Sequence, residues 1–418
     1  MSPTHRVGAC DGWILAAAAF AAAPLAVFAP LGMAPLFAVA ALALLIADAF
    51  AGNGWPRGLI AAWRVSRSLR LFALLGALVC AWAVASATWA VEPAQALTAS
   101  GQVFGTLCAA IVCLAAAYGL PTEMRARIGK ALLAGLIAAA TLLIAERLSD
   151  AWIGHQLGAL GPGGPDQIFS RYNRALSVLL MLAAPALIAL RGAGARWALG
   201  ILALGLVAAF YGSSLQLAAL AGVIALLLAL ALPRVTPWLT GGAVALFVAA
   251  APLLPPLTAG ALDTDTLTAR TQNVSIAHRI IVWQFSAERI AEKPLAGWGM
   301  NAARAIPGGK EKVVLIPNAT PILGEKLPLH THNAPLQWWL ELGLPGAVLM
   351  AGLWLFALVA LARAFPARGP RAFALAGYAA AFVIAGLSYG AWQAWWLATL
   401  GLAAALLAAQ AARPRETS

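Results

Sequence analysis

Long apolar runs separated by short polar turns constrain this chain more than any other feature of its sequence. Several reach about 17–22 residues, and a helix of that length crosses a hydrocarbon core of about 30 Å. Because lipid offers the backbone no hydrogen-bond partners, such runs must be helices, and they lack the period-two alternation of barrel strands. Only 10% of the residues are charged, against about 25% in a soluble domain.

These runs predict an all-α polytopic membrane protein with about twelve transmembrane helices. The run from Trp13 is interpreted as a first span rather than a removed signal, because no small-residue cleavage site follows it. The spans are placed at about 13–29, 32–50, 71–89, 97–119, 131–147, 174–190, 198–212, 214–232, 238–255, 337–361, 372–388 and 391–410.

The loops between the runs predict the orientation. Short loops on one side hold 16 of the 27 basic residues, and short loops rich in lysine and arginine face the cytoplasm. Both termini are therefore expected in the cytoplasm. The net charge of +12 follows from loops that face anionic lipid head groups, so it requires no nucleic-acid partner.

The spans and loops divide the chain into three parts. Residues 1–255 hold nine helices with short loops, apart from a small outer loop at about 148–173. Residues 256–336 form a large outer loop, and residues 337–418 hold the last three helices and a cytoplasmic tail. A loop this long in a compact protein is usually functional.

The predicted spans contain few polar groups. Ionisable residues deep in a span would indicate an ion or proton path, and they are almost lacking here. Gln102, Gln216 and Gln393 are the main deep polar side chains, each expected to form a hydrogen bond between helices. The cysteines, with neither a disulfide framework nor zinc spacing, are interpreted as small apolar residues: Cys10, Cys80, Cys108 and Cys113.

The segment His330-Thr331-His332-Asn333 lies where the large loop ends and the tenth predicted span begins. Asn333 suits an N-cap and Pro335 suits a first helical turn, which puts His332 at the mouth of the helix. An imidazole is a natural general base near neutral pH. His332 is therefore the candidate base, and His330 is expected to be a loop residue.

A polar stripe is predicted below this motif. Glu341 lies one turn beyond Gln337 and two turns beyond Asn333, so the three share a helix face. A carboxylate at this depth needs a partner. Gly343 and Gly346 would allow another helix to approach closely.

Two sets of outer arginines are candidate anion ligands. Residues 275–292 have helical periodicity and predict an interfacial helix, on which Arg279 and Trp283 share a face. Arg279 would either bind a lipid-borne phosphate or anchor the helix by snorkelling. Arg171 and Arg174 open the sixth span, where they would bind an anion at a helix N-terminus or anchor it at the interface.

Two metal sites are alternative interpretations of the residues in this loop. His278 could join His330 and His332 around zinc, and Asp263 with Asp265 resembles an acidic pair that holds a divalent cation on a diphosphate. The histidines lack an acidic or thiolate companion at a defined spacing, and the aspartates fit a solvated loop. Neither a metal nor another cofactor is expected.

In these features the chain resembles the O-antigen ligase family, within the superfamily of O-antigen ligases, polymerases and bacterial O-oligosaccharyltransferases. The resemblance covers the topology, with one large loop before the last three helices. One departure is the span that begins Ser213-Ser214, where many relatives carry a Ser-Arg pair. The motifs that carry the resemblance are His332-Asn333 with Leu336, Glu341, Gly343 and Gly346, and Arg279, Trp283 and Pro294 with Gly297 and Gly299.

The resemblance implies a GT-C-like, metal-independent, inverting glycosyltransferase in the bacterial inner membrane, with its active site at the periplasmic face. The donor would be O-antigen on undecaprenyl diphosphate, and the acceptor a sugar hydroxyl of lipid A–core. His332 would be the base, Arg279 would also offset charge in catalysis, and Asn333, Glu341 and Trp283 would support them. The candidate diphosphate ligands are Arg171, Arg174, Arg270 and Arg279.

Three alternatives remain at this point. An O-antigen polymerase of the same superfamily would use the same surface to join repeat units. A protein O-oligosaccharyltransferase usually carries extra C-terminal sequence, whereas this chain stops soon after the last predicted span. A lipid or solute transporter would need a polar path, which the spans barely offer.

Overall fold

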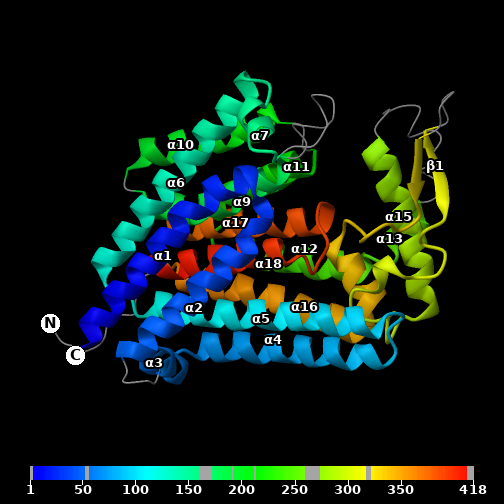
Figure 1. Cartoon of the computed structure of the whole chain (residues 1–418), viewed down its shortest axis with the longest axis horizontal. Helices are drawn as coiled ribbons and strands as arrows, with labels where there is room; N and C mark the ends of the chain where they lie inside the picture. The colour runs from blue at the N-terminus through cyan, green and yellow to red at the C-terminus, as the bar shows by residue number, and fades with distance from the viewer. Residues whose placement is uncertain are drawn as a thin grey trace.

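The chain folds into a bundle of long helices with a smaller part attached at one end (Figure 1). The computed structural model describes residues 3–51, 56–159, 172–190, 192–210, 213–258, 274–316 and 322–411. Every predicted span coincides with a helix of the bundle. These helices are α1 (Pro3–Phe28), α2 (Met33–Ala51), α4 (Arg67–Ala85), α5 (Pro93–Tyr118), α6 (Thr122–Leu148), α9 (Asn173–Ala189), α10 (Ala193–Ala209), α11 (Ser213–Ala231), α12 (Thr236–Ala250), α16 (Ala334–Ala364), α17 (Arg368–Leu387) and α18 (Ala394–Gln410).

Length and composition separate these helices into two groups. Within the described residues, eight are long and apolar enough to cross a membrane: α1, α2, α4, α5, α6, α11, α16 and α17. The other four, α9, α10, α12 and α18, are apolar but shorter. The chain is therefore an all-α, multi-pass membrane protein, and the full count of twelve spans stays a prediction.

Small residues let the helices of the bundle pack closely. A side chain added at Gly135 of α6 would meet the backbone of Phe20 in α1, with its Cβ 2.3 Å from the carbonyl oxygen. Close approach of this kind is typical of membrane helices, whose association depends on van der Waals packing. At the end of the bundle away from α15, Gln410 donates to the carbonyl of Arg125, which ties α18 to the start of α6.

Short helices complete the bundle, and the sequence analysis did not predict them. They are α3 (Arg57–Val65), α7 (Trp152–Gln156) and α13 (Leu254–Thr258). Asp48 of α2 caps α3, because its carboxylate accepts from the backbone of Gly58 and Leu59 at 2.8 Å each. A carboxylate at a helix N-terminus satisfies amides that would otherwise lack partners.

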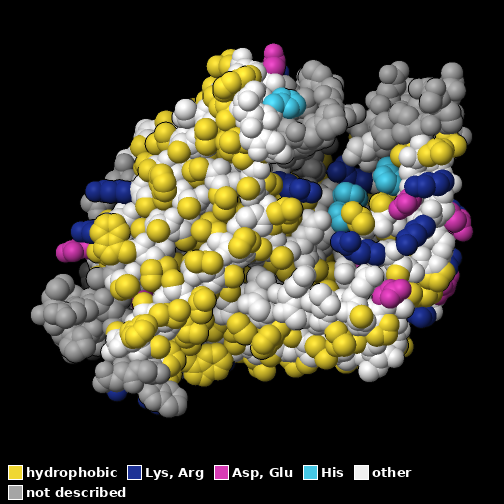
Figure 2. Space-filling view, viewed as in Figure 1, with side chains coloured by type: hydrophobic (Ala, Val, Ile, Leu, Met, Phe, Trp, Pro, Cys, Tyr) yellow, Lys and Arg dark blue, Asp and Glu magenta, His cyan; other side chains and the backbone are white. Residues whose placement is uncertain are grey.

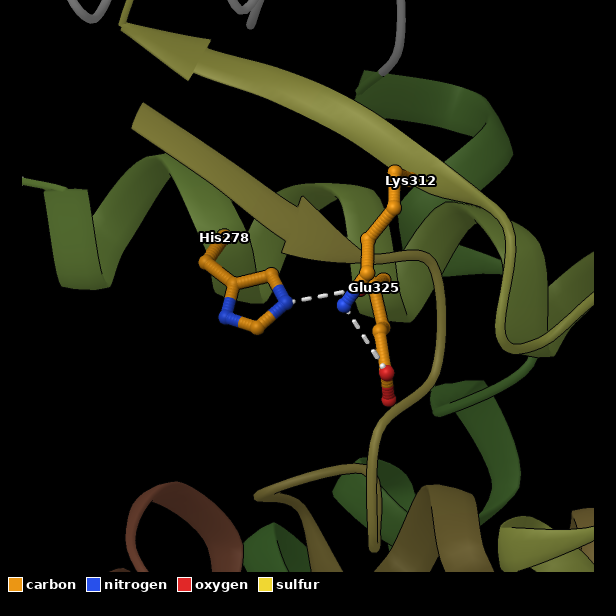
Figure 3. Close-up of polar contacts among 3 residues, drawn as sticks. All are labelled: His278, Lys312 and Glu325. Atoms are coloured by element: carbon orange, nitrogen blue, oxygen red, sulfur yellow. Dashed lines mark hydrogen bonds and ion pairs between the residues drawn. The ribbon is translucent and has the colours of Figure 1, made fainter. Parts of the chain in front are cut away.

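The attached part consists of α15 (Val274–Glu292), the short helix η3 (Ala302–Arg304) and a hairpin of β1 (Lys312–Ile316) and β2 (Ile322–Glu325). The strands are antiparallel, with Lys312 opposite Glu325. Lys312 donates to the Glu325 carboxylate at 3.0 Å, and His278 of α15 lies 2.7 Å from the Glu325 carbonyl (Figure 3). The helix was predicted, whereas the hairpin was not.

The apolar stripe of α15 is buried within the protein. Val282, Phe285 and Ile290 form a second core with Trp298 and with Leu336 at the start of α16. This packing fastens the attached part to α16. The position of the helix at the membrane surface, with aromatic side chains among lipid head groups, stays a prediction.

Helix α16 breaks at Gly343. This glycine has φ 63° and ψ −163°, which interrupts the helix, and Pro345 adds a residue without an amide donor. The backbone around Leu295 enters the break, so a Cβ at Gly343 would lie 2.2 Å from the Leu295 carbonyl oxygen. Gly297, with φ 70°, lies against α16 in the same way, because a Cβ added to it would meet the Glu341 carbonyl. Both glycines are therefore required by close backbone contact.

Donors from outside the helix satisfy the carbonyls that the break would leave free. Leu344 donates its amide to Pro294 rather than back along the helix. Segment 294–300 supplies two of these donors, because Trp298 N donates to Leu340 O at 2.9 Å and Gly299 N donates to Glu341 O at 2.8 Å. Helix α4 supplies a third, because the Trp82 indole donates to Leu342 O at 2.8 Å. Since buried backbone groups must be paired, segment 294–300 is an integral part of this helix.

Candidate active site

His332 lies at the entrance of α16 in a left-handed conformation, with φ 54°. A non-glycine residue rarely adopts this conformation, and it is often found at functional sites. Its Nδ1 lies 2.8 Å from the carbonyl of Ser388, which can only accept, so Nδ1 carries the proton. The unprotonated Nε2 is left as the basic atom. Burial and the positive charge of Arg279 lower the pKa of His332, against an opposing effect of the Ser388 carbonyl.

The residues around His332 fix its backbone. Asn333 caps α16, because its Oδ1 accepts from the amide of Leu336 at 3.1 Å. The Thr331 hydroxyl donates to the Asn333 carbonyl at 2.6 Å, and the Trp283 indole donates to the Thr331 carbonyl at 2.8 Å. The predicted cap is thus confirmed, and Trp283 of α15 contacts the histidine segment directly.

His330 lies in the loop before α16, as expected from the sequence, and it is buried there as part of this arrangement. It is 8% exposed, and its ring centroid lies 4.2 Å from that of His332. Its Nδ1 accepts from the backbone amide of His332 at 3.1 Å. Burial, with the positive charges of nearby groups, lowers the pKa of His330 to about 3, so its ring is neutral.

Glu341 joins three segments below the histidines. Its carboxylate accepts from the amides of Asn301 at 2.7 Å and Ala303 at 3.2 Å. It also accepts from Gln337 at 3.0 Å, the contact that the predicted polar stripe implied, and from the Trp392 indole at 2.5 Å. The buried carboxylate therefore connects segment 301–303, α16 and the loop before α18.

Arg279 brings positive charge to the histidines. Burial lowers the pKa of its guanidinium, and its charge lowers the pKa values of His330 and His332. Its Nε is buried and, among the described residues, has no hydrogen-bond partner. Arg171 and Arg270, the other predicted diphosphate ligands apart from Arg174, lie outside the described residues.

Arg174 lines a cavity of about 350 Å³ beside His330, together with Arg304. Gln393 and Gln102 also line it, as does Trp395, whose ring centroid lies 6.0 Å from the Arg174 guanidinium. Figure 2 shows basic and histidine side chains gathered between the bundle and the part that holds α15. Gln393 was expected inside a span, but it precedes α18 and faces this cavity.

The loop between α17 and α18 supplies residues that the sequence analysis did not include. Ser388 orients His332. Tyr389 lies 2.8 Å from the Ser177 hydroxyl and packs edge-on against Trp395, at 4.7 Å between ring centroids. The sequence signal for this loop is its polar and aromatic residues between two apolar runs. For Arg304 the sequence offers no signal beyond the charge of the side chain.

The histidines of the alternative zinc site do not all come together in the described part of the chain. His278 lies beside the Glu325 carbonyl (Figure 3), whereas His330 and His332 pack against each other. Among the described residues, no group of three or more His, Cys, Asp or Glu side chains could hold a metal ion. Asp263 and Asp265 lie outside those residues.

Residues 197–351 match the sequence model of the O-antigen ligase family. This stretch includes Arg279, both histidines, Asn333, Glu341 and the break at Gly343. Over these residues the chain is therefore similar to the O-antigen ligase family. Arg174 and the loop from Ser388 to Trp395 lie outside the match, so their place beside the matched residues rests on the structure.

Similar proteins occur in Rickettsia, where they are provisionally named polysaccharide ligases. The protein of Rickettsia conorii is 31% identical over 152 residues, which cover 35% of this chain and 35% of the relative. That of Rickettsia bellii is 34% identical over 152 residues, 35% of this chain and 36% of the relative. The match thus spans about a third of the length of each relative.

Proposed function

We propose that this protein is an O-antigen ligase, a glycosyltransferase that moves O-antigen polysaccharide from undecaprenyl diphosphate to a sugar hydroxyl of lipid A–core. One observation carries the proposal. His332 has its Nδ1–H on the Ser388 carbonyl and its Nε2 available as a base, and Arg279 and Arg174 lie around the same histidine pair. A base beside fixed cations suits attack on a sugar whose leaving group is a diphosphate.

The reaction would proceed as one displacement. Nε2 of His332 takes the proton of the acceptor hydroxyl while its oxygen attacks the anomeric carbon. The bond from that carbon to the diphosphate oxygen breaks on the opposite face, so the configuration inverts. Undecaprenyl diphosphate leaves with both bonding electrons, and His332 later releases its proton to water.

Guanidinium groups would offset the charge that develops on the leaving diphosphate. Arg174 and Arg279 are the candidates within the described residues, with Arg171 and Arg270 as further candidates along the chain. Arg304 joins them, because it lines the same cavity as Arg174. Arginine binds phosphate oxygens in a bidentate manner and keeps its charge when partly buried. Such a cluster would replace the metal that many diphosphate-sugar enzymes use.

The membrane setting agrees with this reaction. The basic short loops predict cytoplasmic termini in a bacterial inner membrane, which would place α15 and the histidines at the periplasmic face. Glu341 would act by holding segment 301–303 and the Trp392 loop around the histidines. Asn333 and Trp283 would hold the backbone on which His332 is presented.

The test is ligation by the purified full chain with lipid-linked donor and lipid A–core, with and without chelator. His332→Ala should lower the ligation rate by about 10²–10⁴-fold, the usual contribution of a positioned base. His155→Ala, the same change on an exposed histidine of α7, is the matched control and should ligate normally. Normal ligation by His332→Ala would refute the assigned role.

A deletion strain distinguishes the ligase from the polymerase. Loss of the ligase leaves lipopolysaccharide without O-antigen while lipid-linked polymer accumulates. Loss of a polymerase leaves lipopolysaccharide that carries a single repeat unit. The second outcome would replace the proposed function with polymerisation by the same site.

A further inference from the structure

His330 faces hydrogen-bond donors on both sides of its ring. Its Nδ1 lies 3.1 Å from the backbone amide of His332, and its Nε2 lies 3.3 Å from the side-chain nitrogen of Gln393. A neutral imidazole has one accepting nitrogen and one N–H. It can therefore satisfy one of these two contacts and must place two donors against each other in the second.

Turning the Gln393 amide does not remove this conflict. Its Oε1 accepts from the Trp395 indole at 3.0 Å, and an indole nitrogen only donates. If Oε1 faced His330 instead, the amide NH₂ would face the indole. The His332 amide, His330, Gln393 and the Trp395 indole thus form a row of three contacts. This row has one donor too many in either orientation of Gln393.

Protonation of His330 does not resolve the conflict either. An imidazolium would present N–H groups to both donors. Burial and the charges of His332, Arg304, Arg174 and Arg279 also keep the ring neutral. Among the described residues the row thus lacks an acceptor, which a bound molecule can supply.

The cavity beside His330 is where an acceptor could enter. His330, Gln393 and Trp395 line it, and Arg174 and Arg304 face it with guanidinium groups that only donate. The site thus combines two cations with surplus donors, in about 350 Å³. An anionic oxygen satisfies both requirements, and a phosphate supplies several.

We propose that this cavity binds a phosphate group, and that a phosphate oxygen accepting from His330 Nε2–H fixes the tautomer whose Nδ1 holds the His332 amide. His330 is then a positioning residue that makes the placement of the base depend on bound phosphate. Without the phosphate, Gln393 competes for the ring by favouring the opposite tautomer. With it, the left-handed backbone of His332 keeps its hydrogen bond.

This inference rests on the proposed function, because it gives the bound phosphate a role in ligation. The phosphate has two sources with the same chemistry: the diphosphate of the lipid-linked donor and a phosphate ester on lipid A–core. Both are lipid-borne anions, and the apolar residues Leu31, Ala34 and Ala99 in the same lining suit either.

The first test follows the ring itself. The full chain in lipid nanodiscs, labelled with ¹⁵N-histidine, is titrated with inorganic diphosphate, and sodium chloride of equal ionic strength is the control. His330 is assigned as the resonance lost in His330→Asn. Diphosphate should shift the ring towards the Nε2–H tautomer, and chloride should not. A ring unchanged at saturating diphosphate overturns the proposal.

The same titration distinguishes the two sources. Undecaprenyl diphosphate without sugar is compared with lipid A–core and with the dephosphorylated form of each. A shift produced by one phosphorylated lipid at lower concentration identifies the source, and its dephosphorylated form should have no effect. Equal effects of phosphorylated and dephosphorylated lipids would overturn the proposal.

The second test separates the two edges of the ring by kinetics. An Asn side chain at position 330 can place its oxygen near the Nδ1 position, so His330→Asn should keep kcat within about tenfold and raise KM. His330→Gln places its amide near the Nε2 position, so it should keep KM and lose kcat by more than tenfold. A merely structural role predicts equal losses in both variants, in line with thermal stability, and would overturn the proposal.

The two hypotheses fail in different ways. If the wild-type chain shows the diphosphate-dependent tautomer but does not ligate, the proposed function is wrong and the phosphate site stands. If it ligates while the tautomer ignores diphosphate, the function stands and this inference is wrong.

Discussion

His332 depends on contacts from parts of the chain that are far apart in sequence. Ser388 fixes its tautomer, Thr331 and Asn333 fix its backbone, and Arg279 adds positive charge. Each contact acts on one property of the imidazole: which nitrogen is basic, where it points, or how readily it is protonated. The last property gives a prediction that pH can test.

Ligation should stay near its maximum at pH 6.5 and fall only at lower pH. The base is the neutral ring, and burial with Arg279 lowers its pKa below the ordinary value of 6.5, so the neutral form persists to lower pH. Profiles of kcat/KM between pH 5 and 8 measure this. A rate already halved at pH 6.5 would contradict it.

Arg279→Gln should move the acid limb of that profile to higher pH, because it removes a cation that disfavours the imidazolium. Arg289→Gln is the matched control on the same helix, where Arg289 pairs with Glu292 at 2.9 Å. Its acid limb should stay in place. Equal shifts in both variants would show that Arg279 has no particular influence on the base.

At the scale of elements, α16 and segment 294–300 form one unit. The helix lacks internal hydrogen bonds at its break, and the segment supplies them. This explains the glycines that the sequence analysis marked in both stretches: Gly297 and Gly343 lie where the two backbones meet. The break also sets the direction in which the first turns of α16 present His332.

Gly343→Ala should destabilise the protein markedly. The new Cβ would lie 2.2 Å from the Leu295 carbonyl oxygen, and φ 63° is unfavourable for alanine. Forced contact and strain together should cost about 2–4 kcal/mol, seen as a lower Tm of the full chain in detergent.

Gly352→Ala in the same helix is the matched control. Its Cβ would meet nothing within 4 Å, and alanine favours a helix by up to about 1 kcal/mol over glycine. The control should therefore be neutral or slightly stabilised. Similar behaviour of the two variants would mean that segment 294–300 does not occupy the break.

At the scale of the whole molecule, the end that holds α15 and the histidines lies opposite the end that holds α3 (Figure 1). The distribution of basic residues predicts that α3 faces the cytoplasm. Exposed positions at the two ends, Lys310 near the hairpin and Arg64 in α3, can therefore report orientation.

In a variant without the native cysteines, Lys310→Cys should react with an impermeant maleimide added to intact spheroplasts. Arg64→Cys should react only after the membrane is permeabilised. Quantitative labelling measured by mass shift checks both. The reverse pattern would place the histidines in the cytoplasm and exclude ligation to lipid A–core at the periplasmic face.

The sequence predicted what depends on local pattern. Run length and apolar content located the helices, and the N-cap of Asn333 followed from its neighbours. Contacts between distant residues were out of reach, such as His332 with Ser388 or Arg174 beside Arg304. The hairpin was not predicted although Val313 and Val314 are β-branched, because β1 holds four apolar residues in succession and lacks the period-two alternation of a half-buried strand.

The break in α16 also has a mechanical consequence. The turns that carry His332 are fastened to segment 294–300 and, through Trp82, to α4. The rest of α16 continues beyond Gly343 as a separate rod. Bilayers of different thickness tilt membrane helices, and the contacts of the upper turns with segment 294–300 and α4 would oppose their moving with the lower rod. We therefore expect the setting of His332 to depend little on the thickness of the surrounding bilayer.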